Sequence, residues 1–268
     1  MQIRKPGDQT RKPVKAERNI RLNLAFDGTA YHGWQVQKGP PTIQGILLNA
    51  IGKITGEQVN LIGSGRTDAG THARGLVANF FTRSRIPPAQ LVRALNSSLP
   101  RDIRVLSARR VHAAFHARHS ALSKVYRYQI YRGPVLPPHL AREHYHYPYP
   151  IDVEKMRKAA KRFIGEHDFA SFAAGTPEKN TVRRIFRYDL KSTGRRLIFT
   201  VEGNGFLHHM VRNMVGTLLE VARGRMSLWE FQALFRNRDR TLAGFTAPAH
   251  GLILLKVRYA TPRRHRDR

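Results

Sequence analysis

The spacing of apolar residues changes repeatedly along this chain, and that change most restricts the folds it can adopt. Residues 20–26 alternate apolar and polar side chains, which is typical of a half-buried strand. Residues 206–222 instead carry apolar side chains in one helical stripe. Strand and helix periods follow one another irregularly, and some strands read as hairpin pairs. The pattern therefore predicts an α+β protein rather than a doubly wound parallel sheet.

The same patterns predict individual elements and two halves. Strands are expected near 20–26, 58–62, 75–81, 103–111, 123–131, 181–190, 196–202 and 251–259. Helices are expected from an N-cap at Thr42, at 88–97, from an N-cap at Asp152, at 206–222, and from a capping box at Ser227–Glu230. A Pro- and His-rich connector near 133–150 opens the second half. We expect an N-terminal lobe over 19–118 and a C-terminal lobe over 119–260, flanked by a disordered basic tail at 1–18 and a basic tail at 261–268.

The formal net charge of +29 on 268 residues indicates a polyanionic partner. The tails at 1–18 and 261–268 carry +4 and +3 of that charge, so residues 19–260 retain +22. Such self-repulsion is tolerable when a polyanion is the usual partner, and nucleic acid is the leading candidate. An anionic membrane surface fits less well, because no stretch reads as an amphipathic anchor or a transmembrane run.

Cysteine is absent, which excludes disulfides, thiolate chemistry and zinc sites built on cysteine. The N-terminus is polar and basic and lacks the apolar stretch of a secretory signal. These features predict a cytoplasmic protein.

A glycine-rich loop at residues 63–73 is the segment most suggestive of chemistry. A dinucleotide-binding fingerprint starting at Gly63 would need glycine where Asp68 stands. A phosphate-binding P-loop starting at Gly65 would need lysine at 71 and Ser or Thr at 72, where the chain has Thr and His. What remains is Arg66 two residues before Asp68. In an extended segment the two would share a face and could point into one cleft. Alternatively, Asp68 makes a local turn and Arg66 lies on the surface.

Several ordered motifs resemble those of the tRNA pseudouridine synthase A (TruA) family. They are Gly65–Ala73, Tyr31–Gln35, Gln44–Gly45, Lys124–Tyr128, Gly165, His167–Phe169, Ser171–Phe172, Phe206–Gly216, Ala247–Ala249 and Gly251–Leu252. The resemblance covers most of residues 20–260. It implies isomerisation of uridine to pseudouridine in the anticodon stem-loop of tRNA, around nucleotides 38–40. It also implies two similar-sized lobes around a central mixed, mainly antiparallel sheet with a cleft between them, a homodimer, and no cofactor or catalytic metal.

The resemblance also assigns roles to residues. Asp68 stands at the family's nucleophile position, and Tyr126 at that of the active-site tyrosine that stacks on the target base. Arg66 would fill or support the space that the flipped uridine leaves, although a plain phosphate contact is an alternative. Ordinary packing is the alternative for Tyr126.

Arg212 is the predicted cationic partner of Asp68. It lies off the main apolar stripe of 206–222, and a buried arginine on so apolar a helix needs an anion. Such a partner in a poorly solvated pocket would keep the carboxylate ionised. The alternative is an exposed helix arginine. We therefore expect Asp68 and Arg212 to be catalytic, and Tyr126 and Arg66 to bind substrate.

Three other interpretations fit the sequence less well. The histidine pairs 112/116 and 208/209 lack the glutamate of a zincin-type motif, so no metal site is predicted. A non-catalytic RNA-binding protein or RNA chaperone would share the basic surface but has no reason to keep Asp68 in this loop. A ribosomal or chromatin-like structural protein fits the charge but not the loop.

Overall fold

The computed structural model describes residues 17–175 and 180–260. The two predicted tails therefore lie outside the described residues, apart from Glu17 and Arg18. Arg18 is not part of a tail, because it begins the first strand, β1 (Arg18–Phe26). Its guanidinium also donates hydrogen bonds to the carbonyl oxygens of Ser84 and Ile86.

The described residues contribute ten strands to one sheet, whose long path runs in the order β4-β1-β3-β10-β5-β9-β8-β7. Its members after β1 are β2 (Ile62–Gly63), β3 (His72–Thr82), β4 (Ile103–Val111), β5 (Ala121–Tyr131), β6 (Tyr145–His146), β7 (Gly165–Asp168), β8 (Val182–Thr193), β9 (Arg196–Gly203) and β10 (Leu252–Tyr259). The pairs β10–β3 and β5–β6 are parallel and the others antiparallel. The expected α+β fold with a mixed, mainly antiparallel sheet is confirmed.

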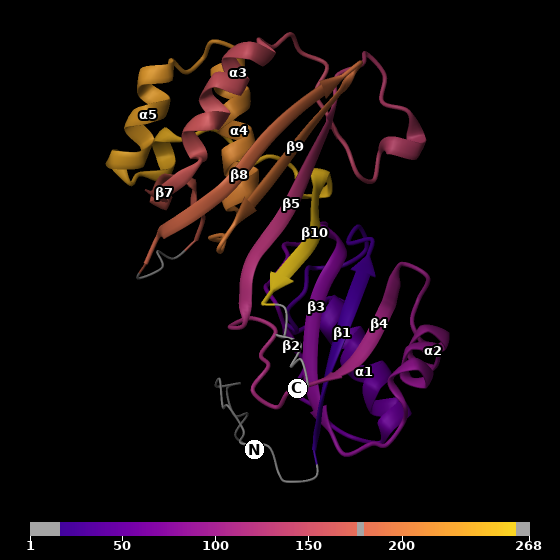
Figure 1. The fold of residues 1–268 in the computed structure, drawn as a ribbon. Helices are drawn as coiled ribbons and strands as arrows, with labels where there is room; N and C mark the ends of the chain where they lie inside the picture. The colour runs from indigo at the N-terminus through magenta and orange to yellow at the C-terminus, as the bar shows by residue number, and fades with distance from the viewer. Residues whose placement is uncertain (1–16, 176–179, 261–268) are drawn as a thin grey trace, which may run out of the picture.

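The last strand, β10, joins the two halves of the chain (Figure 1). It lies between β3 from the first half and β5 from the second. Leu254 on β10 pairs with Ala73 on β3 and with Tyr126 on β5. The register of β10 therefore brings the loop that precedes β3 next to the strand that carries Tyr126.

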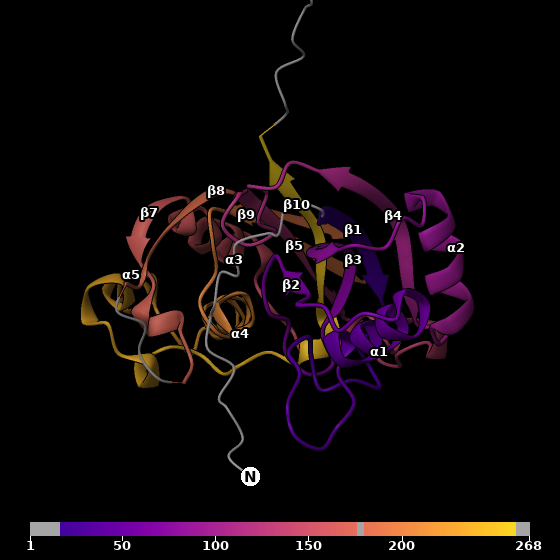
Figure 2. The ribbon, with the colours of Figure 1, turned by 90° about the horizontal axis from the view of Figure 1, so that it is seen from below.

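Helices in two groups pack on the sheet. The first group is α1 (Ile43–Thr55) and α2 (Pro88–Ser98), and the second is α3 (Val153–Ala160), α4 (Met210–Ala222) and α5 (Leu228–Asn237). Figure 2 shows α1 and α4 on the same side of the sheet. The strand face toward them is fully buried at Leu22, Tyr128 and Phe199, which places the core between sheet and helices. No helix of the described residues is both long and apolar enough to cross a bilayer.

The predicted helix starts are confirmed at three caps. The hydroxyl of Thr42 accepts a hydrogen bond from the amide of Gly45, and the carboxylate of Asp152 accepts one from Lys155. Ser227 and Glu230 form the reciprocal capping box. These side chains satisfy amide groups that have no partner within the helix, and so fix where each helix begins.

Two predicted boundaries are wrong. The helix expected from 206 begins only at Met210, because His209 has a left-handed backbone (φ 58°) and residues 208–209 form a turn. The strand expected at 58–62 is reduced to Ile62–Gly63. The carbonyl oxygen of Leu61, just before this strand, accepts a hydrogen bond from the side chain of Gln44 on α1. This segment therefore bonds to the helix and not to a neighbouring strand.

Candidate active site

A cleft of about 890 Å³ opens between the two halves of the chain. Its walls come from the glycine-rich loop, from β5 and from residues 206–211 before and at the start of α4. Asp68 is the only carboxylate among the described residues that line it. The other charged or titratable side chains there are Arg66, Arg118 and Lys124 with five histidines, at 32, 116, 119, 208 and 209, and the phenol of Tyr126. The cleft therefore suits an anionic ligand approaching a single acid group.

The segment around Trp34 supports the glycine-rich loop. The amide of Trp34 donates to the carbonyl oxygen of Thr67 (3.1 Å), and the amide of Gly70 donates to that of Tyr31 (3.2 Å). A Cβ on Gly33 would lie 2.4 Å from the Thr67 carbonyl oxygen, and the φ of Gly33 is +80°. Only glycine fits both conditions. The two motifs, far apart in the sequence, thus build one rigid loop that presents Asp68.

Arg212 forms an ion pair with Asp68, as the sequence predicts. Its Nη1 lies 2.9 Å from Oδ2 of Asp68, and its Nε donates to the carbonyl oxygen of Ala247 (2.7 Å). The two side chains are only 14% and 20% exposed. Arg212 is therefore not an exposed helix arginine, because two acceptors fix its guanidinium plane against the acid group.

The carbonyl group of Ala247 is itself held by close packing on α4. A Cβ on Gly216 would lie 1.7 Å from the carbonyl oxygen of Phe245, so only glycine allows this approach. Asn213, which is fully buried, accepts a hydrogen bond from the hydroxyl of Thr246 (2.7 Å). The segment around 245–247 is thus fixed against the helix that carries Arg212.

Tyr126 and Arg66 line the same cleft as Asp68. The ring of Tyr126 is 7% exposed and meets the ring of Phe206 edge-on, with centroids 5.0 Å apart. Burial, and secondarily the charge of Asp68, raise the pKa of Tyr126 well above its usual value, so the phenol stays neutral. Arg66 is exposed at the rim of the cleft. All four residues chosen from the sequence therefore meet at one place.

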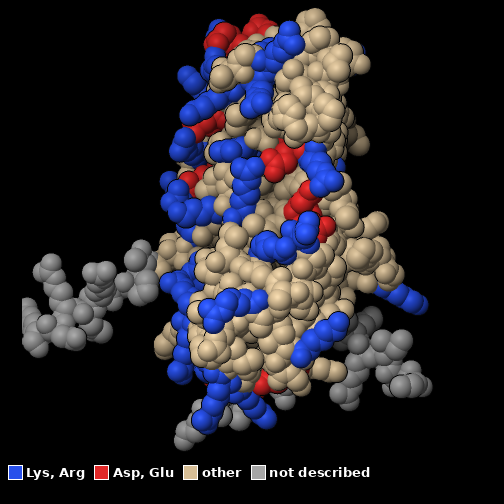
Figure 3. All heavy atoms as spheres, turned by 90° about the vertical axis from the view of Figure 1, so that its right-hand side faces the viewer, with Lys and Arg blue, Asp and Glu red and all other residues tan. Residues whose placement is uncertain are grey.

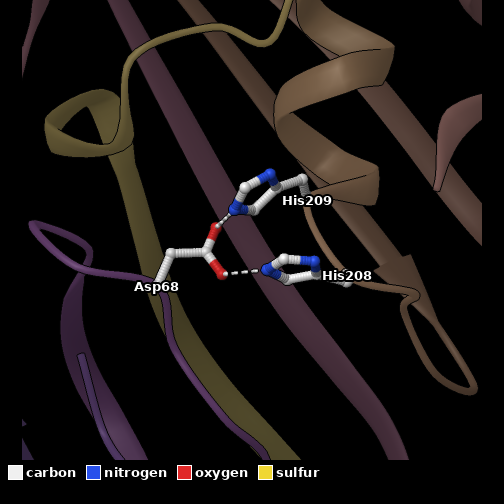
Figure 4. Close-up of side chains that lie close together, drawn as sticks. All are labelled: Asp68, His208 and His209. Atoms are coloured by element: carbon white, nitrogen blue, oxygen red, sulfur yellow. Dashed lines mark ion pairs between the residues drawn. The ribbon is translucent and has the colours of Figure 1, made fainter. Parts of the chain in front are cut away.

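Two histidines also lie beside Asp68, and the sequence analysis did not place them there (Figure 4). The Nε2 atoms of His209 and His208 are 3.5 Å and 3.9 Å from the carboxylate oxygens. Burial lowers the pKa of His209; Asp68 opposes this shift, while Arg212 and His208 add to it. Both histidines belong to the same motif as Arg212, Phe206–Gly216, and this proximity in the sequence could have indicated that they lie near Asp68. The turn at His209, which directs both side chains toward Asp68, could not be predicted from the residue types.

Asp68, His208 and His209 place potential ligand atoms within 4.8 Å of one another. A cation bound there would compete with Arg212, whose Nη1 already lies 2.9 Å from Asp68 Oδ2. A guanidinium in contact with the carboxylate makes this a poor metal site electrostatically. We therefore keep the sequence prediction of no catalytic metal.

The fold and the cleft define a class of protein: one that presents a single carboxylate to a ligand from within a cleft of otherwise cationic side chains, as a protein that acts on a polyanion would. The sequence pattern of the family described as tRNA pseudouridine synthase matches residues 24–120 and 159–260. The chain belongs to the tRNA pseudouridine synthase family.

Within this family, the chain is similar to curated proteins named tRNA pseudouridine synthase A. The proteins named tRNA pseudouridine synthase A from Caldicellulosiruptor saccharolyticus and Solibacter usitatus are both 46% identical, over 243 and 246 residues. The protein of that name from Thermoanaerobacter sp. (strain X514) is 44% identical over 243 residues. Each match covers 90% of this chain and all of the relative. A solved Cbf5-Nop10-Gar1 complex aligns with a TM-score of 0.35 and 14% identity, over 72% of this chain and 46% of that one.

Proposed function

We propose that this protein isomerises uridine to pseudouridine in the anticodon stem-loop of tRNA, around nucleotides 38–40, with Asp68 as the catalytic carboxylate. The observation that carries the proposal is the ion pair with Arg212 of Asp68, which lines a cleft whose other charged side chains are cationic. Membership of the family and the high identity to proteins named tRNA pseudouridine synthase A support the substrate.

The chemistry requires little besides one acid group. The bond between C1′ and N1 breaks, the uracil turns, and C1′ bonds to C5. C5 then loses a proton and N1 gains one, so atoms and electrons balance without redox change or external energy. A carboxylate can add covalently to the substrate, or remove a sugar proton to give a glycal intermediate. Both routes use Asp68, and neither needs a cofactor.

The neighbours of Asp68 take distinct roles in this proposal. Arg212 fixes the direction of the carboxylate, because it is bound on its other side to the Ala247 carbonyl. Tyr126 stacks on the turned base inside the cleft. A uridine reaches the partly buried carboxylate only after flipping out of its stem or loop, which costs a few kcal/mol. Arg66 at the rim fills the space that the nucleotide leaves.

The proposal also includes a homodimer, two lobes and a cytoplasmic location. The homodimer and the two-lobe boundary near residue 118 are supported by the resemblance to the TruA family. A cytoplasmic location is supported by the proposed tRNA substrate. Figure 3 shows one face of the molecule on which Lys and Arg side chains outnumber Asp and Glu and gather along one edge, a distribution that favours binding of a polyanion.

The function is tested with unmodified tRNA carrying tritium at C5 of uridine. Wild-type protein should release the label without added metal or cofactor, and chemical mapping of the product should place pseudouridine within nucleotides 38–40. Release with pseudouridine formed elsewhere would overturn the anticodon assignment. Tight, salt-sensitive binding without release would favour the non-catalytic RNA-binding alternative.

Replacing Tyr126 tests the stacking role. Tyr126→Ala should lower kcat/KM by roughly 10- to 100-fold, since stacking one base on an aromatic ring contributes about 1–3 kcal/mol. Tyr126→Phe keeps the ring and should stay within about threefold of wild type. Tyr188→Phe, which alters a buried ring on β8 outside the cleft, is the matched control. Equal losses in both Tyr126 variants would assign the effect to the hydroxyl group and remove the stacking role.

A further inference from the structure

A second cationic group lies in the cleft beside the Asp68 pocket. Lys124 is on β5, two residues before Tyr126, and lines the cleft together with Arg118. A Cβ on Gly65 would lie 3.0 Å from the Nζ of Lys124, so the ammonium group sits directly against the catalytic loop. No carboxylate of the described residues forms an ion pair with Lys124, and the charged groups that act on it, Arg118 and Arg183, are both cationic.

This environment is unfavourable to the charged form of lysine. Burial lowers the pKa of Lys124 to about 8, and Arg118 and Arg183 add to the shift. His116 and His119 also line the cleft and bring no negative charge toward the ammonium group. Arg183, on β8, is itself a cation, and its guanidinium donates to the carbonyl oxygens of Asn180 and Val182. A lysine held among cations without a counter-charge indicates that the anion arrives with the ligand.

The spacing along β5 suggests which anion fits. Two residues of a strand span about 6–7 Å, which is comparable to the distance from a nucleobase to its backbone phosphate. Lys124 and Tyr126 both line the cleft. If Tyr126 takes the base, a phosphate of the same backbone therefore comes within reach of position 124.

We propose that Lys124 and Arg118 bind one backbone phosphate of the RNA beside the flipped uridine, an inference that rests on the proposed function. Lys124 provides the point charge next to Gly65, and the exposed Arg118 closes the site from the solvent side. Binding the phosphate supplies the missing counter-charge. Protonation of Lys124 and binding of RNA are then thermodynamically linked.

The direction of this linkage follows from the pKa. In the free protein Lys124 loses its proton as the pH rises through about 8, whereas a bound phosphate favours the protonated form. RNA affinity is therefore constant below about pH 7 and falls above pH 8. For one group with a free pKa near 8, the loss between pH 7 and pH 9 reaches about tenfold at most.

The test measures the Kd of unmodified tRNA at several salt concentrations for wild type, Lys124→Met and Lys124→Arg. At pH 7, Lys124→Met should weaken binding about tenfold and lower the salt slope by about one, as expected for one lost phosphate contact. Lys124→Arg should bind as wild type at pH 7 and keep its affinity at pH 9, because arginine stays charged. Lys53→Met, an exposed lysine in the last turn of α1, should leave both the slope and the pH dependence unchanged.

A second readout places the phosphate. Single methylphosphonate linkages are introduced along an anticodon stem-loop RNA, each removing one backbone charge. One linkage should weaken binding to wild type but not to Lys124→Met. An unchanged salt slope in Lys124→Met would overturn the proposal. So would a lower kcat at saturating RNA that Lys124→Arg does not restore, since that would make Lys124 a proton-transfer group. The salt slope and the scan of methylphosphonate linkages are binding measurements, so they are independent of tritium release, on which the proposed function depends.

Discussion

Asp68→Asn should abolish tritium release from tRNA, with a loss of about 10⁴-fold or more. Asparagine has nearly the same shape, and its amide oxygen can still accept the hydrogen bond from Arg212. An uncharged amide, however, is neither a nucleophile nor a base toward a sugar proton. Both possible routes to pseudouridine therefore stop, while the cationic walls of the cleft continue to hold RNA. The measurement is single-turnover release of tritium alongside the Kd of unmodified tRNA.

The control for Asp68→Asn is Asp189→Asn, which changes a carboxylate on β8 that pairs with Arg187 outside the cleft. That variant should release label at the wild-type rate. The Kd of Asp68→Asn should equal the wild-type value or be slightly lower, because removing the acid group makes the cleft more positive. Undiminished release by Asp68→Asn would remove Asp68 from the mechanism and would assign the reaction to another group.

Local patterns in the sequence predict most of the elements but not how they are joined. The alternation at 20–26 and the caps at Thr42, Asp152 and Ser227 depend on neighbouring residues, so they are visible without a structure. The position of β10 between β3 and β5 is different. It pairs Leu254 with Ala73, which lie far apart in the sequence, and apolar periodicity contains no record of such a partner.

The same distinction applies to the site. Arg212 could be chosen because an arginine off the apolar stripe of a buried helix needs an anion. The carbonyl group of Ala247, which accepts a hydrogen bond from the other side of the Arg212 guanidinium, could not be predicted. It belongs to the backbone, and its position depends on the close approach of the chain to Gly216. His209 was missed because a left-handed backbone is uncommon for residues other than glycine, so the pattern favoured a continuous helix.

Arg212→Ala should lower kcat by about 10²- to 10³-fold, with a smaller change in Kd. The guanidinium bonds to Asp68 on one side and to the Ala247 carbonyl on the other, so its removal frees the carboxylate to rotate. Preorganised charges in a poorly solvated site have effects of this size on rate. Arg212→Lys should recover only part of the rate, because one ammonium group cannot reproduce the planar geometry that reaches both acceptors. Single-turnover rates and Kd values measured for both variants separate orientation from binding.

Arg225→Ala is the matched control, since this exposed arginine follows the same helix and lies 3.9 Å from Glu220. It should change neither kcat nor thermal stability, because exposed ion pairs contribute about 0–1 kcal/mol. A wild-type kcat in Arg212→Ala would show that Asp68 keeps its direction without the ion pair. A loss confined to Kd would instead make Arg212 a phosphate-binding residue. The predicted loss in kcat, with partial recovery in Arg212→Lys, would show that the reaction depends on Arg212 holding the Asp68 carboxylate in one direction.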